Sequence, residues 1–195
     1  MFTGIITDIG IVKLVEVADG GKRFVISTAY DVVDIDMGAS IACNGACMTV
    51  AGKAQGEFTI FMSDESLKCT NFDDVEAGAK INLERSLKMG DELGGHIVTG
   101  HVDVVTYIKN IEKIGENKKL TFDLPNSFAK FVAEKGSVTL NGVSLTVNNV
   151  DDVAFDVNLI PHSLENTIFG DAKVGDKINM EIDILARYVA RMNAI

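Results

Sequence analysis

Four side chains of the kind that ligate zinc occur in the sequence, namely Cys43, Cys47, His96 and His101. There is no Cys-x-x-Cys pair, and the histidines do not fall at metal-binding spacing on a predicted helix. On one extended strand, a separation of four residues would place Cys43 and Cys47 about 13 Å apart. The pattern therefore predicts no metal site.

Cys47 and His101 also suit a second chemistry, in which an imidazole activates a thiol nucleophile. Ser144 offers a hydroxyl group in a similar predicted strand. Taken singly, a cysteine is more often a small buried hydrophobe, and a lone serine is usually structural. Residue type alone therefore leaves the catalytic and the structural interpretation open.

An internal repeat changes this weighing. Residues 39–50 return as residues 136–147, 97 positions further on, with Ser, Asn, Gly, Thr and Val at matching places. Cys47 and Ser144 are equivalent in the two copies but differ in chemistry. The repeat thus predicts two related pockets that have become unequal, which suits two copies of one ligand or one ligand held by two halves.

Each copy of this stretch has one polar and one apolar face, because side chains alternate between the faces of a strand. Cys47 and Thr49 share the polar face of the first copy, and Ser144 and Thr146 share that of the second. The Asn-Gly pair that precedes them suits a tight turn or a bulge, since Gly adopts positive φ freely and Asn tolerates it.

The repeat covers nearly the whole chain. Residues 78–84 return as 175–181, and Thr3-Gly4 returns as Thr99-Gly100 at an offset one residue shorter. Self-similarity at this long period predicts a duplicated domain. The expected units are residues 1–97, 98–183 and a tail at 184–195.

Runs of Val, Ile, Phe and Thr between Gly, Asp and Asn predict strands in both halves. About six short strands per half indicate an all-β fold of two homologous six-stranded antiparallel β-barrels. The expected strands cover 2–6, 9–17, 22–28, 39–51, 57–62, 79–85, 98–109, 118–123, 136–149, 154–159 and 176–182. Short helices are expected at 63–71, 125–134 and 162–169.

The tail breaks the repeat and is expected to form a helix over residues 184–195. Leu185, Tyr188, Met192 and Ile195 recur at the spacing of a helix–helix seam. The pattern favours an oligomerisation helix that packs on another subunit. The alternative is a helix docked on its own barrel.

The formal net charge of −10 argues against nucleic acid as a partner, because such sites need clustered Lys and Arg. We expect no signal peptide at the start of the chain and no membrane-spanning segment. The odd number of cysteines, three, fits reduced thiols. These features predict a soluble cytoplasmic protein.

Several motifs, in this order along nearly the whole chain, strongly resemble the alpha-type riboflavin synthase family with its two lumazine-binding repeats. They are Met1-Phe2-Thr3-Gly4-Ile5-Ile6, Asn44-Gly45-Ala46-Cys47-Met48-Thr49-Val50, Gly94-Gly95-His96-Ile97-Val98-Thr99-Gly100-His101-Val102-Asp103, Asn141-Gly142-Val143-Ser144-Leu145-Thr146-Val147, Leu159-Ile160-Pro161-His162-Ser163-Leu164, Asn179-Met180-Glu181-Ile182-Asp183 and Arg187-Tyr188.

The resemblance implies a dismutation of two 6,7-dimethyl-8-ribityllumazine molecules. One gives a four-carbon unit to the other, which yields riboflavin and 5-amino-6-(D-ribitylamino)uracil, and no metal or redox cofactor is required. Holding two identical heterocycles face to face is proximity catalysis. The resemblance also implies a homotrimer, and a contact with lumazine synthase is a further possible association.

The resemblance assigns pocket residues to each half and expects four residues to affect the rate. The first pocket would be lined by Gly4, Ile5, Ile6, Cys47, Met48, Thr49, Phe61, Met62, Ser63, Asp64, Glu65 and Ser66. The second would be lined by Gly100, His101, Val102, Ser144, Leu145, Thr146, Leu159, Ile160, Pro161, His162, Ser163 and Leu164. The residues expected to affect the rate are Ser144, Cys47, His101 and Asp183, with Ser144 or a bound water as nucleophile or proton relay. Lys135 matches a lysine that reaches a ligand in the neighbouring subunit.

The sequence departs from the family where Ser66 and Ser163 replace the usual Thr, and where Met48 replaces Leu. The hydroxyl groups are kept, and cores tolerate the exchange of Leu for Met. The main alternative is a non-catalytic lumazine- or flavin-binding protein of the same fold, in which we expect the second pocket to degenerate. A structural oligomerisation module would bind no ligand. Formation of riboflavin from the lumazine discriminates among these classes.

Overall fold

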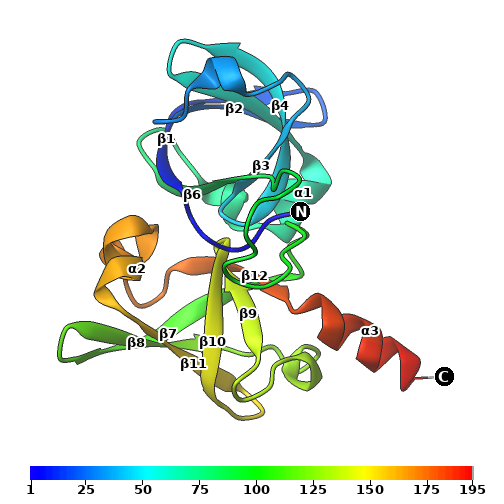
Figure 1. Cartoon of the computed structure of the whole chain (residues 1–195), viewed down its shortest axis with the longest axis vertical. Coiled ribbons are helices and arrows are strands. Elements are labelled where there is room, and N and C mark those ends of the chain that lie inside the picture. The colour runs from blue at the N-terminus through cyan, green and yellow to red at the C-terminus, as the bar shows by residue number, and fades with distance from the viewer. Residues whose placement is uncertain (195) are drawn as a thin grey trace.

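Six antiparallel strands close the first barrel in the spatial order β1-β2-β5-β4-β3-β6 (Figure 1). The computed structural model describes residues 1–194. The strands of this barrel are β1 (Asp8–Ala18), β2 (Gly21–Ser27), β3 (Ser40–Cys43), β4 (Ala46–Ala54), β5 (Glu57–Ser63) and β6 (Lys80–Arg85).

The second barrel has the same construction, with the spatial order β10-β11-β8-β7-β12-β9. Its strands are β7 (Val104–Ile114), β8 (Asn117–Asp123), β9 (Ser137–Leu140), β10 (Val143–Val150), β11 (Ala154–Leu159) and β12 (Lys177–Ile182). The prediction of two homologous six-stranded antiparallel barrels is therefore confirmed.

The boundaries of the expected strands needed three kinds of correction. Residues 39–51 and 136–149 each form a two-strand hairpin, because the chain turns at Asn44-Gly45 and at Asn141-Gly142, where all four φ angles are positive. Residues 2–6 form no strand, and only Phe2 pairs, in an isolated bridge with Val98. The strand expected from residue 98 begins at residue 104.

Short helices follow β5 and β11 as predicted, but each ends before the expected residue. Helix α1 (Asp64–Cys69) begins after Ser63, whose hydroxyl accepts from the Ser66 amide at 3.2 Å. Helix α2 (Pro161–Asn166) begins with a proline, whose fixed φ suits the first helical position. The 3₁₀ turn η2 (Asn71–Asp74) follows α1 and η4 (Ile168–Asp171) follows α2, whereas η1 (Val32–Asp34) lies between β2 and β3.

The helix expected over residues 125–134 is wrong. The segment contains only the 3₁₀ turn η3 (Ala129–Phe131), which has no side-chain cap at Phe128. Its aromatic residues Phe128 and Phe131 pack on the core of the second barrel, and Val132 is buried there. Packing on the barrel therefore decides the conformation of this segment.

Helix α3 (Ile184–Met192) follows β12 and projects away from both barrels (Figure 1). Leu185, Tyr188 and Met192 are exposed on it, and no residue of the helix is buried. Ile195, the last residue of the expected seam, lies outside the described residues. None of the helices within residues 1–194 is long and apolar enough to cross a membrane.

The barrels meet where their Asn-Gly turns lie back to back. A Cβ added to Gly45 would lie 2.6 Å from the Gly142 amide nitrogen, and one added to Gly142 would lie 2.9 Å from that of Gly45. The Asn82 side chain donates to the Asn141 carbonyl, and that of Asn179 donates to the Asn44 carbonyl, both at 2.9 Å. The turns of the repeat thus form the interface between its copies.

Two ion pairs at equivalent positions tie the barrels together at the surface. Lys80 of the first barrel pairs with Asp171 of the second at 2.7 Å, and Lys177 of the second pairs with Asp74 of the first. All four side chains are largely exposed to water, which limits what each pair contributes to stability. The buried asparagine contacts are therefore the more specific part of the interface.

Candidate functional site

The polar faces of β4 and β10 are the first element of the candidate site. Cys47 and Ser144 are half-buried, Thr49 and Thr146 are exposed, and the alternate residues of both strands are buried. The predicted alternation of polar and apolar faces is therefore correct in both copies.

Cys43 and Cys47 lie on neighbouring strands, β3 and β4, across the Asn44-Gly45 turn, and not on one strand as expected. Cys43 is buried, and burial raises the pKa of its thiol, which keeps it neutral. Within residues 1–194, no three His, Cys, Asp or Glu side chains gather in a way that would hold a metal ion.

Two irregular segments, each with a bend at a glycine of positive φ, lie against the polar strands. We call residues 3–6 the N-terminal segment and residues 99–102 the linker segment. The Ser144 amide donates to the Gly4 carbonyl at 2.8 Å, and the Cys47 amide donates to the Gly100 carbonyl at 2.8 Å. Each segment is therefore bonded to the polar strand of the barrel that belongs to the other half of the sequence.

This arrangement corrects the expected assignment of the segments to the two pockets. Ile6 packs against the core of the second barrel, and Val102 packs against that of the first. Gly4, Ile5 and Ile6 thus accompany Ser144, whereas Gly100, His101 and Val102 accompany Cys47. The sequence reasoning assigned each segment to the pocket of its own half of the chain. The repeat shows which residues are equivalent, but it does not show that a segment of one half packs on the barrel of the other.

His96, which the sequence reasoning considered only as a metal ligand, contacts a residue of the candidate site. Its Nδ1 lies 2.6 Å from the Ser144 Oγ, and its Nε2 lies 3.1 Å from the Thr139 Oγ1. Burial lowers its pKa, and the nearby Asp183 carboxylate opposes this shift in part. The neutral imidazole with its proton on Nε2 can accept the Ser144 proton while it donates to Thr139.

The repeat could not identify His96, because its counterpart in the first copy would precede Met1. The available signal was its place in the Gly94–Asp103 motif. Ser144 and Asp183 thus gather around His96, whereas Cys47 lies beside the segment that carries the exposed His101. The four residues expected to affect the rate therefore form two groups. Asp183 also caps α3, where it accepts from the Leu185 amide at 2.8 Å.

The remaining predicted residues follow the polar strands in each barrel. In the first, Phe61 is exposed at the end of β5 and Ser63, Asp64, Glu65 and Ser66 form the start of α1, whereas Met62 is fully buried in the core. In the second, Leu159 is fully buried, and Ile160, Pro161, His162, Ser163 and Leu164 form the start of α2. Met48 and Leu145 are also core residues. These four core residues, Met48, Met62, Leu145 and Leu159, support the candidate site through packing.

Lys135 occupies a backbone conformation that is unusual for its type. Its φ is +63°, and its amide donates to the Val147 carbonyl at 2.8 Å. The equivalent position in the first copy is Gly38, with φ +83° and the same bond to Val50. A lysine at a position suited to glycine is held there at a cost in backbone energy, which points to a role for its side chain.

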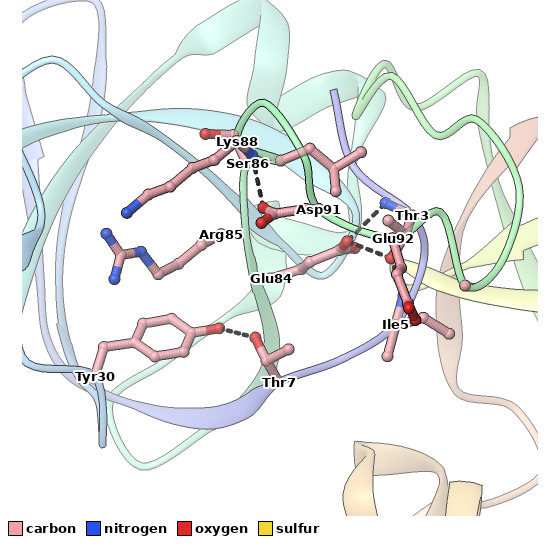
Figure 2. Close-up of a pocket in the computed structure, with 12 residues that line it drawn as sticks. Thr3, Ile5, Thr7, Tyr30, Glu84, Arg85, Ser86, Lys88, Asp91 and Glu92 are labelled. Carbon is pink, nitrogen blue, oxygen red and sulfur yellow. Dashed lines mark hydrogen bonds between the residues drawn. The ribbon is translucent and has the colours of Figure 1, made fainter.

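A cavity of about 590 Å³ lies beside the N-terminal segment (Figure 2). It is lined by Thr3, Ile5, Glu84 and several residues between Arg85 and Gly94, in the stretch that joins the two barrels. Burial raises the pKa of Tyr30 in its wall to about 12, so the phenol stays protonated. Among the predicted site residues only Ile5 reaches this cavity, which is therefore separate from the polar faces.

Two closed barrels of one construction, each with an equivalent but chemically different polar strand face, define a duplicated twin-barrel protein. The lumazine binding domain family matches residues 3–86 and 99–183. The riboflavin synthase of Brucella abortus (strain 2308) is 50% identical over 197 residues, which cover 98% of each chain. That of Mycobacterium tuberculosis (strain ATCC 25618 / H37Rv) is 38% identical over 196 residues, again 98% of each.

A solved structure of LumP complexed with riboflavin has a TM-score of 0.87 and 25% identity, and covers 93% of this chain and 99% of that one. LumP complexed with 6,7-dimethyl-8-(1'-D-ribityl) lumazine has a TM-score of 0.84 and 25% identity, with 93% and 98% covered. The chain belongs to the riboflavin synthase family, with a lumazine binding domain in each barrel.

Proposed function

We propose that this protein is a transferase that dismutates two molecules of 6,7-dimethyl-8-ribityllumazine. One molecule gives a four-carbon unit to the other, and the products are riboflavin and 5-amino-6-(D-ribitylamino)uracil. Together these products hold the atoms of the two substrates, so the transfer needs no external oxidant. The single observation that carries the proposal is the pair of equivalent half-sites in a chain that is 50% identical to a riboflavin synthase.

The two half-sites take one lumazine each in this proposal. The first comprises the polar face of β4, the start of α1 and the linker segment. The second comprises the polar face of β10, the start of α2 and the N-terminal segment. Ser144, alone or through a bound water, acts as nucleophile or proton relay, and its contact with His96 at 2.6 Å supports proton transfer there. Cys47, His101 and Asp183 complete the set that affects the rate.

The reacting pair forms between subunits of a homotrimer. Helices α1 and α2, which carry parts of the two half-sites, lie on opposite sides of the molecule in Figure 1, so a second chain is the simplest way to bring the half-sites face to face. The exposed apolar face of α3 supplies the surface for the association. We further propose units at 1–97, 98–183 and 184–195, a cytoplasmic location, and a possible contact with lumazine synthase.

Incubation of the purified full-length chain with 6,7-dimethyl-8-ribityllumazine tests the reaction. We expect riboflavin and the pyrimidinedione to form in equal amounts, as separated and quantified by chromatography. The alternative is a binding protein without activity, to which the similarity with the LumP complexes gives some support. Bound, fluorescent lumazine without any riboflavin would favour that alternative over the enzyme.

Lys135→Asn is expected to impair substrate use without a loss of stability. Asparagine tolerates the left-handed backbone, so the free energy of unfolding should change by less than about 1 kcal/mol. Loss of a charge-assisted hydrogen bond to the ligand should raise KM by roughly tenfold or more. Steady-state kinetics and denaturant unfolding measure the two effects. The exposed Lys130 on the same loop gives the matched control, Lys130→Asn. Equal kinetics of the two variants would exclude a ligand contact by Lys135.

A further inference from the structure

A buried glutamate in the last strand of the first barrel holds the N-terminal segment. Glu84 on β6 accepts three hydrogen bonds, from the Thr3 amide at 2.6 Å, the Thr3 hydroxyl at 2.8 Å and the Gly4 amide at 3.0 Å. Figure 2 shows the Glu84 carboxylate pointing at Thr3. Burial raises the pKa of Glu84, and its hydrogen bonds with Thr3 and Gly4 oppose this shift because they favour the charged carboxylate. Three hydrogen bonds to one side chain fix the position of this segment.

The second barrel repeats the arrangement with a different segment. Glu181 on β12 accepts from the Thr99 amide and hydroxyl, both at 2.7 Å, and from the Gly100 amide at 2.9 Å. Both carboxylates are almost completely buried. Glu84 and Glu181 therefore make the same three hydrogen bonds, each with a different Thr-Gly pair.

Each segment is bonded on its other side to the opposite barrel. Glu84 of the first barrel holds the N-terminal segment, and the Gly4 carbonyl of this segment accepts a hydrogen bond from the Ser144 amide of the second barrel. Glu181 of the second barrel holds the linker segment, and the Gly100 carbonyl of this segment accepts a hydrogen bond from the Cys47 amide of the first barrel.

The fit between segment and strand leaves no spare room. A Cβ added at Gly4 would lie 2.5 Å from the Ser144 Cβ, and one added at Gly100 would lie 2.5 Å from the Cys47 Cβ. A small shift of either segment must therefore move the residue that it contacts.

We infer that Glu84 and Glu181 are crossed positioning residues, in which the glutamate of one barrel sets the half-site of the other. Glu84 positions Ser144, and Glu181 positions Cys47. Neither glutamate touches the ligand in this inference, and each acts only through the Thr-Gly pair that it holds. The inference rests on the proposed function for its consequence in catalysis, but the crossing itself is a property of the folded chain.

Amide hydrogen exchange in the full-length protein tests the crossing without any ligand. The glutamine variants keep the size of the side chain, but their NH₂ group cannot accept from the donors that face it. In Glu84→Gln, exchange at the Ser144 amide should accelerate about tenfold or more, whereas exchange at Cys47 should stay unchanged. In Glu181→Gln, the Cys47 amide should accelerate and Ser144 should not. The exposed Glu76→Gln and Glu116→Gln are the controls.

The affinity for riboflavin provides a second test, because a purely structural role of the glutamates would not produce a coupling that is specific to one half-site. In double-mutant cycles, Glu84→Gln should couple to Ser144→Ala and should be additive with Cys47→Ser, and Glu181→Gln should show the reverse. If Glu84→Gln fails to fold, Thr3→Ala removes one of the three bonds and should shift exchange at Ser144 in the same direction, with Thr3→Ser restoring it.

Exchange that accelerates at both amides alike, or in the glutamate's own barrel, would overturn the inference. If hydrogen exchange accelerates only in the opposite barrel but the protein forms no riboflavin, the positioning by the glutamates is supported and the proposed reaction is refuted. The two proposals therefore fail separately.

Discussion

Replacement of Ser144 by alanine is expected to lower kcat by about a hundredfold to a thousandfold, while substrate affinity changes much less. This range is typical for the loss of a positioned proton-transfer group. A larger fall in kcat than in affinity marks an interaction made mainly in the transition state. Rapid-mixing kinetics together with equilibrium binding of the lumazine separate the two quantities. The exposed Ser127→Ala serves as the control.

His96 should act with Ser144 as a unit, since their side chains lie 2.6 Å apart. The variant His96→Gln should lower kcat by a similar factor, and the double variant should lose little more than either single one. His101→Gln should also lower kcat, but its effect should multiply with that of Ser144→Ala, because His101 belongs to the other group. If both Ser144→Ala and His101→Gln changed only KM, these residues would be binders.

The pH dependence of the reaction follows from the lowered pKa of His96. Only the neutral imidazole can accept a proton, so kcat should fall as His96 becomes protonated on the acid side. Because burial lowers this pKa, the fall should occur below the ordinary histidine value of 6.5. The acid limb should disappear or move in His96→Gln. An unchanged pH profile in that variant would show that another group titrates.

Disruption of α3 is expected to convert the trimer into monomers and to abolish most of the activity. Its outward face carries Leu185, Tyr188, Val189 and Met192, all at least 58% exposed in the single chain. Burial of such side chains contributes roughly 1.5–3 kcal/mol each, which suffices to drive association. The helix itself is anchored to its own barrel by the Arg187–Asp103 ion pair at 2.8 Å.

The double variant Tyr188→Asp/Met192→Asp should therefore remain folded, and light scattering should report the mass of one chain. Arg191→Asp, on the same helix but off the apolar face, is the control. A trimer that persists in the double variant, or in a chain that lacks residues 184–195, would remove the role proposed for α3.

Mixed oligomers test whether the reacting half-sites come from different chains. Cys47→Ser and Ser144→Ala chains, each first shown to be poorly active, would be unfolded together and refolded. A site between subunits lets the intact first half of one chain meet the intact second half of the other, so activity should exceed the mean of the parents. Activity that stays at the mean in oligomers shown to be mixed would place each site within one chain.

The sequence by itself determined the features that depend on short-range pattern or on comparison of one half with the other. The alternation around Cys47 and Ser144 fixed which side chains face the core, because strand periodicity is local. The cap at Ser63 likewise set where α1 begins. The duplication revealed two barrels of one construction, since equal patterns of strands and turns close in the same way.

Only the tertiary structure decided which residues of the two halves meet. Gly4 and Ser144 are far apart in the chain, and no local pattern encodes their hydrogen bond. Residues 125–134 have a helical pattern, but their phenylalanines pack on the barrel in another conformation, because burial outweighs a weak local preference. His96 had no equivalent to compare. The exchange of segments, the back-to-back Asn-Gly turns and the His96–Ser144 contact all depend on how two barrels dock, which is a long-range property of the folded chain.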